Sequence, residues 1–397
     1  MKKRLICMAL AIFVMSQFTA CGSEKPVEEL GTIPTVNTIK LNGSSIEISG
    51  SGMSVEGNVV KISAPGSYTV SGTLDNGQIF VDVADETVET ELILDNAHIS
   101  NAEDSAIYIE TGKDLKLKFK GENSLTSGNS ALPVDENASG AALYSEDDMS
   151  IKGEDDAVLK VFGYINNGIA TKNDLDFKGG NVVVLASNNG ARGADSVEIK
   201  GGRLEITSGN DGIKATTTDK EGKGYISVEN GEVIVNAKGD GIEAPASLNI
   251  SGGIVRLFSE KDGVSCIGDV NISGGEVKIS SASDAIQAGE ANSGKGNVNI
   301  SGGTVLLDAC EEALKPRGVL NVSGGVLLAL DGKDKSNEGS GFWQQSHMGA
   351  KGTEVSLSND GAVCASVTSG YSFKAIIVGN TASGYSVSDG KTTIEVK

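Results

Sequence analysis

Four aspartates stand at equivalent places of a repeated pattern, and they are the residues whose type and spacing could bind a metal ion. They occur at intervals of 29, 22 and 22 residues: Asp211, Asp240, Asp262 and Asp284. If each interval is one turn of a coil, their carboxylates stack at about the 4.8 Å strand spacing and repel one another by about 1 kcal/mol or more. Calcium would relieve this repulsion because it prefers carboxylate and carbonyl oxygens as ligands.

The same four aspartates also fit an ordinary structural role. Three of them are followed by Gly, which is common turn chemistry, and Lys238 and Lys261 lie close enough in the sequence to neutralise charge. On residue evidence the turn role is favoured over calcium binding, and both interpretations stay open.

A second set of side chains, each three residues after a turn signal, is expected to point outward as one straight strip. Its members in chain order are Tyr108, Tyr144, Ala170, Arg192, Lys214, Glu243, Ser265, Gln287 and Lys315. Such a strip suits a linear glycan, because aromatic rings stack on sugar faces and the cations of Arg192 and Lys214 bind uronate carboxylates. An ordinary mixed polar surface explains the same residues equally well. The predicted carbohydrate-binding residues are Tyr108, Tyr144, Arg192, Lys214, Glu243, Gln287 and Lys315.

Two alternating turn signals position these side chains between about residues 139 and 330. The first signal is Asn, Asp or Glu followed by Gly or Ala, and the second is Gly or Asn followed by Gly. Starting from Asn167, successive first signals are separated by 22, 22, 29, 22, 22 and 28 residues. Starting from Gly179, successive second signals are separated by 22, 29, 22, 22, 28 and 22 residues. The two series agree with a shift of one place, which indicates a solenoid.

The residues between the turn signals alternate between apolar and polar, as in short strands. One turn cannot bury its apolar residues alone, so turns must stack and pair in parallel. The sequence therefore predicts an all-β, right-handed parallel β-helix with turns of about 22 residues and capping strands at both ends. The inward-facing columns of three successive turns are predicted to be Leu248, Ile250, Val255 and Leu257, then Val270, Ile272, Val277 and Ile279, then Val298, Ile300, Val305 and Leu307.

Two turns are longer than the others, and both carry their extra residues after the first turn signal, at 216–224 and 289–296. Both insertions should therefore emerge from the same side of the coil. Insertions on one face often mark a binding face, although tolerated surface loops explain them equally well.

The opening of the folded region resembles a known family. The segments 39–45, 66–74 and 77–82, together with the repeated elements 211–215 and 250–253, are similar to the bacterial carbohydrate-binding-domain β-helix family. The resemblance extends over about residues 39–387. It implies an exported, non-catalytic protein that binds cellulose-like or acidic polysaccharide such as polygalacturonate, and it also implies bound calcium.

A lyase is the first alternative, because the same architecture occurs in pectate-lyase-like enzymes that use an Arg base and calcium-bound aspartates. Arg192 beside the aspartate column could imitate that arrangement, but fold alone does not establish function. The residues identify no acid and base at glycosidase spacing. With only His98 and His347, the chain also disfavours a His-based zinc site or a Ser-His-Asp triad. A protein-binding surface adhesin is the second alternative.

The first residues are typical of an exported lipoprotein. A basic start and an apolar stretch precede the segment Phe18-Thr19-Ala20-Cys21, which resembles a lipobox with Cys21 as the lipidated residue. An ordinary signal peptide is the alternative, and the apolar stretch is too short to span a membrane. We expect a signal peptide at 1–20, a polar tether at 21–38, the β-helix at 39–340 and a C-terminal β cap at 341–397.

Composition limits the partners. The 397 residues carry a formal net charge of −20, which disfavours nucleic acid as a partner because the two polyanions repel each other. Cys266 stands where other turns have Ala, so it is expected to be a small core residue. The sequence thus predicts a monomeric, extracytoplasmic surface lipoprotein that contacts the membrane only through its lipid and binds polysaccharide with calcium.

Overall fold

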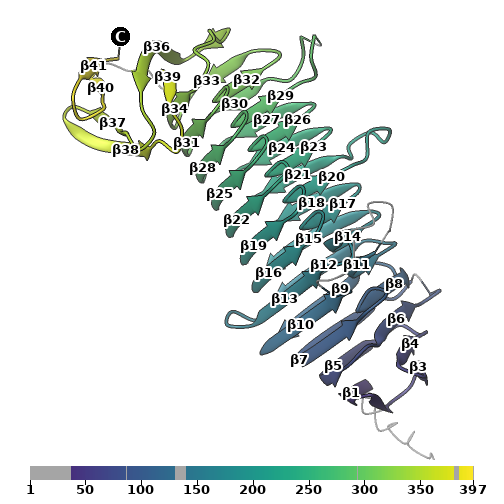
Figure 1. The fold of residues 1–397 in the computed structure, drawn as a ribbon. Coiled ribbons are helices and arrows are strands. Elements are labelled where there is room, and N and C mark those ends of the chain that lie inside the picture. The colour runs from purple at the N-terminus through teal and green to yellow at the C-terminus, as the bar shows by residue number, and fades with distance from the viewer. Residues whose placement is uncertain (1–36, 86, 130–139, 293, 380–383, 397) are drawn as a thin grey trace, which may run out of the picture. The chain divides into compact units, whose positions relative to one another are not determined.

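The computed structural model describes residues 37–85, 87–129, 140–292, 294–379 and 384–396. Within these ranges every regular element is a β-strand, and most strands belong to a parallel β-solenoid with antiparallel strands at both ends (Figure 1). The predicted fold class is therefore confirmed. The expected signal peptide and Cys21 lie outside the described residues, as does the expected tether apart from Asn37 and Thr38, which begin the first strand. Among the described residues, no helix is long and apolar enough to cross a membrane.

One face of the solenoid is a sheet of 12 short strands, here called sheet B. Apart from the antiparallel pair β3 and β4, its strands pair in parallel from one turn to the next. Its strands are β3 (Met53–Glu56), β4 (Val59–Ile62), β6 (Gln78–Asp82), β8 (Ile107–Thr111), β11 (Ala141–Ser145), β14 (Asn167–Thr171), β17 (Ala191–Gly193), β20 (Ile213–Ala215), β23 (Ile242–Ala244), β26 (Val264–Cys266), β29 (Ile286–Ala288) and β32 (Leu314–Pro316).

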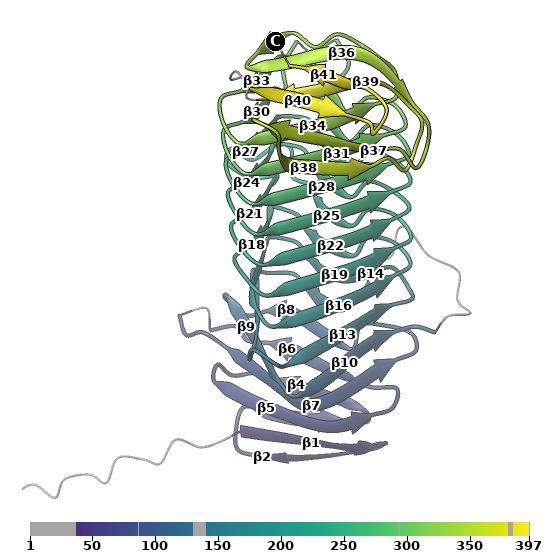
Figure 2. The same cartoon turned by 90° about the vertical axis from the view of Figure 1, so that its left-hand side faces the viewer.

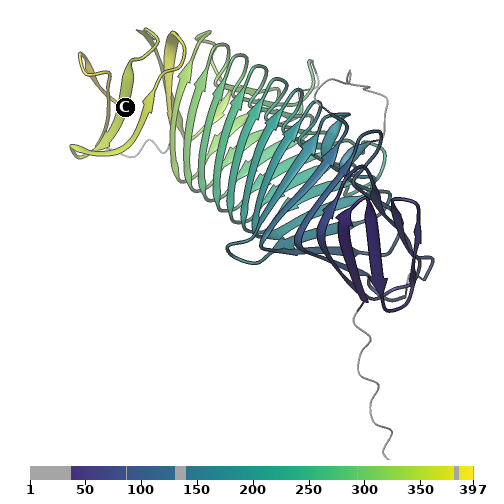
Figure 3. The same ribbon diagram turned by 60° about the horizontal axis from the view of Figure 1, so that its bottom comes forward.

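The remaining solenoid strands belong to sheet A, a 25-stranded sheet that also includes strands at both ends of the solenoid. Its solenoid strands form two columns that meet at the Gly-Gly turns. The first column consists of β9 (Leu115–Lys120), β12 (Met149–Gly153), β15 (Asp174–Gly179), β18 (Ser196–Ile199), β21 (Tyr225–Val228), β24 (Ser247–Ile250), β27 (Asp269–Ile272), β30 (Val298–Ile300), β33 (Leu320–Val322) and β35 (Gly339–Ser340). The second column consists of β10 (Glu122–Ser127), β13 (Val158–Gly163), β16 (Asn181–Ala186), β19 (Arg203–Ser208), β22 (Glu232–Ala237), β25 (Ile254–Ser259), β28 (Glu276–Ser281), β31 (Thr304–Ala309) and β34 (Val326–Asp331). Figure 3 shows the strands of successive turns stacked along the solenoid.

The core is the continuous interior of this stack. Apolar side chains alternate with outward side chains on each strand, and the predicted inward columns are at most 1% exposed in all three turns compared. Cys266 is also buried, as expected, and burial raises the pKa of its thiol to about 11. Because one turn of the coil has little interior of its own, each turn depends on its neighbours for burial.

The second glycine of each Gly-Gly turn has a left-handed backbone conformation and lies close to the backbone of the preceding turn. Gly275 has φ +82°, and a Cβ atom at this position would lie 2.7 Å from the carbonyl oxygen of Gly253 in the preceding turn. Only glycine tolerates both the left-handed conformation and this close approach between turns. The regular stacking that the repeat predicted therefore depends on these glycines.

Antiparallel strands close both ends of the solenoid. At the N-terminal end, β1 (Asn37–Gly43) pairs with β2 (Ser45–Ser49) and with β5 (Ser67–Leu74), and β7 (Glu91–Asn101) continues both columns of sheet A. At the C-terminal end, β36 (Phe342–Gly349) and β39 (Phe373–Gly379) pair antiparallel with each other, and β39 also pairs with β34. A separate four-stranded sheet contains β37 (Glu354–Asn359), β38 (Ala362–Thr368), β40 (Tyr385–Ser388) and β41 (Thr393–Glu395). These strands cover sheet edges that would otherwise recruit other chains.

Candidate functional site

The strip predicted from the sequence lies on sheet B, but one of its members, Ala170, is fully buried, contrary to the expectation that it points outward. Strand pairing places its nine members directly next to one another from Tyr108 to Lys315. The structure extends the strip beyond Tyr108 by Phe80 and Lys61, which the sequence did not assign to it. The alternation of Gln78, Ile79 and Phe80 was the available signal, but the first turns do not keep the 22-residue period.

The aromatic end of the strip differs from the expected flat platform. Tyr144 is only 4% exposed, so its ring offers no free face to a sugar, contrary to the expectation of an exposed ring. The ring centroids of Tyr108 and Tyr144 are 5.5 Å apart, and Phe80 packs edge-on against Tyr108 at 5.4 Å. The hydroxyl groups of both tyrosines donate to Glu146, at 3.4 Å from Tyr108 and 3.2 Å from Tyr144. These rings pack against one another, which is a geometry the sequence spacing does not encode.

The cationic side chains of the strip differ in whether they pair with a carboxylate. The ammonium of Lys214 lies 2.8 Å from Oδ2 of Asp211 and also pairs with Glu243. Lys315 lies 2.5 Å from Oδ2 of Asp284. Arg192 instead contacts the Thr216 hydroxyl at 3.4 Å, and no described carboxylate lies within ion-pair distance of its guanidinium.

The predicted aspartate column is present and forms a hydrogen-bonded ladder. Oδ1 of each aspartate accepts a hydrogen bond from the backbone amide of the residue that occupies the same place in the next turn. The four distances from donor nitrogen to acceptor oxygen are 2.9 Å from Asp240 to Asp211, 3.0 Å from Asp262 to Asp240, 3.0 Å from Asp284 to Asp262 and 2.9 Å from Glu312 to Asp284. The ladder supports the turn role that the residues favoured.

The ladder continues toward the N-terminus with asparagine instead of aspartate. The amide of Asp211 donates to Oδ1 of Asn189 at 3.2 Å, and the amide of Asn189 donates to Oδ1 of Asn167 at 3.2 Å. A neutral side-chain amide therefore performs the same structural task as a carboxylate. The negative charge of the aspartates is not needed for the ladder itself.

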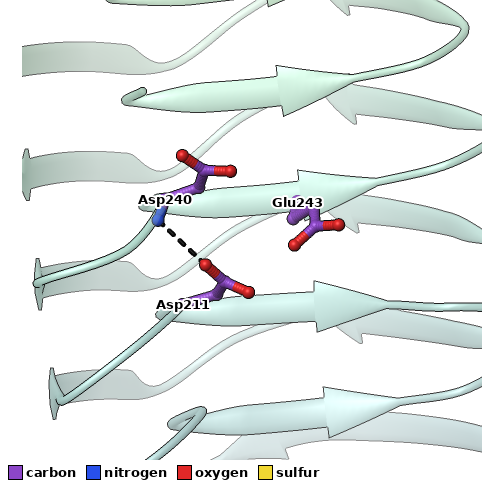
Figure 4. A group of neighbouring side chains, drawn as sticks. All are labelled: Asp211, Asp240 and Glu243. Carbon is purple, nitrogen blue, oxygen red and sulfur yellow. Dashed lines mark hydrogen bonds between the residues drawn. The ribbon is translucent and has the colours of Figure 1, made fainter. Parts of the chain in front are cut away.

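Three carboxylates come close enough to share a cation. One oxygen atom from each of Asp211, Asp240 and Glu243 lies within 4.8 Å of the others (Figure 4). Glu243 was expected on the glycan strip, and the structure brings it into this acidic group because β23 follows directly from Asp240. Among the described residues, Asp262 and Asp284 do not join the group. The set of hard oxygen donors fits calcium, although Lys214 already binds two of the three carboxylates.

Crowding and burial perturb these carboxylates. Burial, followed by the charges of the neighbouring acids, raises the pKa of Asp240 to about 6. Burial also raises the pKa of Glu243, and its hydrogen bond to Asp211 acts in the same direction. Burial alone would raise the pKa of Asp211, but hydrogen bonds with Glu243, Lys214 and the Asp240 amide together lower it. Burial and mutual repulsion thus favour the protonated forms of Asp240 and Glu243, and the one ammonium of Lys214 pairs with Asp211 and Glu243 only.

The two insertions lie on one side, as predicted. The first follows β20 and the second follows β29, and both project from the same edge of sheet B (Figure 1). In the first insertion, Lys223 lies 2.7 Å from Asp174 and Lys220 lies 3.3 Å from Asp195. This insertion is therefore tied to earlier turns of the solenoid, and its first residue, Thr216, contacts Arg192 of the strip.

Comparison with known proteins identifies related sequences and one related structure. The sequence model of one family, described as carbohydrate-binding domain-containing protein, matches residues 56–259 and 246–395. A carbohydrate-binding domain-containing protein of Acetivibrio thermocellus is 36% identical over 195 residues, which cover 46% of this chain and 65% of the relative. This chain therefore spans less than two thirds of that relative's length. The gadolinium derivative of the polysaccharide lyase-like protein from C. thermocellum superimposes with a TM-score of 0.55 at 36% identity, covering 61% of this chain and 100% of that chain.

Proposed function

The chain belongs to the carbohydrate-binding domain-containing family, and on this premise we propose that it binds an acidic polysaccharide along the sheet B strip without cleaving it. The proposal includes calcium as an assisting ion and lipid anchorage through Cys21 outside the cytoplasm. Polygalacturonate is the ligand that best fits the strip, because a uronan presents one carboxylate on each sugar.

The observation that best supports this proposal is that Arg192 has no carboxylate partner among the described residues. Its neighbour in the strip, Lys214, is committed to Asp211 and Glu243, whereas no described carboxylate pairs with Arg192. A guanidinium without a carboxylate partner on an outward face is suited to bind a uronate through two parallel hydrogen bonds. We therefore expect Arg192 to contribute more than the other strip residues to the affinity for an acidic glycan.

The acidic group beside Arg192 supports the calcium part of the proposal. Asp240 and Glu243 would hold the ion, with Asp211 as a third ligand if Lys214 moves aside. A bound calcium ion would add positive charge where a uronate carboxylate approaches the strip. The chain's own contribution is to hold two of the three carboxylates in fixed positions, since Oδ1 of Asp211 and of Asp240 is anchored in the ladder.

Lipid anchorage rests on the sequence alone. The segment that ends at Cys21 resembles a lipobox, with Phe18 in place of the usual Leu, and the described fold begins at Asn37. Metabolic labelling with a radioactive fatty acid should mark the wild-type protein and not Cys21→Ala. Equal labelling of the two proteins would refute the assignment of Cys21.

A lyase is kept as the second candidate, because the structural relative is described as polysaccharide lyase-like. Arg192 would be the base in that case, and its guanidinium lies on the strand next to Lys214 and the acidic group. Cleavage of a uronan by elimination produces an unsaturated product that absorbs ultraviolet light. If this product accumulates with calcium present and Arg192→Ala abolishes it, the non-catalytic assignment is wrong.

The deciding experiment is calorimetry of the leaderless protein with polygalacturonate, in calcium and then in chelator. We expect binding heat with calcium and much less heat with chelator. Arg192→Ala should weaken binding by about tenfold or more, as expected for a lost charge-assisted hydrogen bond. Arg203→Ala is the matched control, because Arg203 lies on sheet A and pairs with Glu205 and Glu232. Equal affinities of the two variants would remove Arg192 from the site.

A further inference from the structure

A second candidate site lies on another face of the solenoid, where the second column of sheet A meets the C-terminal strands. A cavity of about 350 Å³ opens here. Residues of β19, β22, β25 and β28, of the turns that follow β22 and β25, and of the turn before β39 line it. They include Thr207, Asn236, Lys238, Phe258, Glu260, Ser280 and Tyr371. Figure 2 faces this side and shows β38 beside β31 at the C-terminal end of the solenoid.

The floor of the cavity is an outward column of sheet A. Strand pairing places Thr207, Asn236, Phe258 and Ser280 next to one another in successive turns. The ring of Phe258 is 43% exposed, whereas its neighbours in this column are polar. A single exposed apolar residue needs no explanation in general, but this ring lies inside a cavity that has polar walls.

Tyr371 forms the end wall of the cavity, and Asp308 holds the turn that carries it. Oδ2 of Asp308 accepts a 2.7 Å hydrogen bond from the amide of Gly370 and a 3.3 Å hydrogen bond from the hydroxyl of Ser280. Asp308 is 4% exposed and lies directly after Ser280 in the column. The carboxylate therefore joins the solenoid to the C-terminal segment, whose Tyr371 lines the same cavity as Phe258.

The serine hydroxyls in the cavity lining are bonded internally, but four other polar side chains there are not bonded to any described residue. The side chains of Asn236, Lys238, Glu260 and Tyr371 make no hydrogen bond or ion pair with any described residue. On the strip, by contrast, Lys214 and the acidic residues around it are paired. The cavity thus presents donors and acceptors that remain available to a ligand.

The chemistry of the cavity points to an uncharged sugar. A phenyl ring and a phenol supply apolar surfaces for the faces of sugar rings, while the amide and the hydroxyl groups can exchange hydrogen bonds with sugar hydroxyls. Lys238 and Glu260 carry opposite charges, so the cavity has no net preference for a uronate. Arg192 on sheet B is better suited than this cavity to bind an acidic glycan.

We propose that this cavity, centred on Phe258 and Tyr371, is a second saccharide subsite that takes a segment of neutral glycan. The inference rests on the proposed polysaccharide-binding function but uses a separate face and separate residues. A protein with both sites binds an acidic glycan on sheet B and a neutral glycan on sheet A. Simultaneous engagement of two chains would also raise the avidity for a mixed cell-wall surface.

The test is calorimetry of the leaderless protein with two neutral probes, cellohexaose and mannohexaose, and with polygalacturonate in parallel. Phe258→Ala should weaken binding of the neutral probe by at least about fivefold, and Phe258→Trp should preserve it. Leu185→Ala is the matched control, because Leu185 is 39% exposed in the same outward column but lies outside the cavity. Both Leu185→Ala and Arg192→Ala should bind the neutral probe as the wild type does.

The outcomes separate this subsite from the function proposed for sheet B. Wild-type protein that binds neither neutral probe overturns the subsite, whatever its affinity for polygalacturonate. Unchanged neutral-glycan affinity in Phe258→Ala overturns it as well. If polygalacturonate fails to bind while Phe258→Ala still loses the neutral probe, the sheet B proposal fails and the subsite stands.

Discussion

The backbone amide of Asp240 donates a 2.9 Å hydrogen bond to Oδ1 of Asp211, one turn earlier in the solenoid. This bond defines what the aspartate column does. One oxygen of each carboxylate stabilises the stack of turns, and the other oxygen remains for a cation. Turn formation and ion binding are therefore compatible uses of the same residue, and the charge can be changed without breaking the ladder.

Asp240→Asn should stabilise the protein at neutral pH. The pKa of Asp240 is raised from its ordinary value of 3.8 to about 6 by burial and neighbouring acids, so the folded state favours the protonated form. That contribution is fully present below about pH 4 and is lost as pH rises through about 6. Asparagine keeps the Oδ1 acceptor and carries no charge, as Asn189 does one turn before Asp211.

The gain of Asp240→Asn at pH 7 should be about 1–3 kcal/mol, after allowance for partial exposure of the site. Denaturant unfolding at pH 4 and pH 7 measures it. A variant that is equally or less stable than the wild type at pH 7 would show that the negative charge of Asp240 does not destabilise the folded state.

Lys214→Gln should make the protein's stability depend on calcium. Removing the ammonium leaves Asp211 and Glu243 without their cation and should lower the unfolding free energy by about 1–3 kcal/mol. Calcium binds the folded state preferentially and should restore part of this loss. Thermal unfolding with and without calcium chloride should therefore show a larger rise in Tm for the variant than for the wild type.

Lys315→Gln is the control for Lys214→Gln. Lys315 also pairs with a buried aspartate, Asp284, but Asp284 is not in the group of three carboxylates. The control should lose stability without gaining a calcium response. If calcium raises Tm equally in the wild type and both variants, the group around Lys214 is not a calcium site.

Gly275→Ala should destabilise the solenoid by about 1–3 kcal/mol or more. The new Cβ would lie 2.7 Å from the carbonyl oxygen of Gly253, and the residue would keep a φ of +82°, which alanine disfavours. Gly201→Ala is the matched control, because Gly201 stands first in its Gly-Gly pair and its Cβ would meet only the Lys178 carbonyl, at 3.4 Å. Equal midpoints in denaturant unfolding would contradict the packing requirement.

Asp308→Ala should loosen the turn that carries Tyr371. The amide of Gly370 would lose its hydrogen-bond acceptor, which costs about 1–3 kcal/mol if the amide stays buried. Asp308→Asn keeps an oxygen acceptor and should behave like the wild type. Limited proteolysis at the 369–372 turn, followed by mass spectrometry, should show faster cleavage only in the alanine variant. Equal cleavage of all three proteins would mean that Asp308 does not anchor this turn.

Much of the fold could be predicted because a solenoid converts sequence spacing directly into position. Once two turn signals repeat together, every residue between them has an equivalent in the next turn. For this reason the order of the strip from Tyr108 to Lys315 and the inward columns such as Ile250 and Val255 were both predicted correctly. The first turns lack the period, so Phe80 and Lys61 were missed.

Sequence spacing alone could not predict which neighbours a side chain packs against or forms an ion pair with. Tyr144 occupies its predicted place, yet it is buried in a cluster with Ala141 and Ala170, against which Tyr108 packs. Glu243 occupies its predicted place, yet it shares Lys214 with Asp211. Rotamers and local charge decide these contacts, and a repeat in the sequence carries no information about either.

By itself, the sequence determined the solenoid, the register of its turns and the columns that face inward or outward, because these follow from local periodicity and the burial it requires. Only the tertiary structure decided which cations remain free, which carboxylates meet, and how Tyr371 comes to line the same cavity as Phe258. Those relationships join residues with no shared periodicity, through side-chain packing and through a C-terminal segment that folds back onto the solenoid face.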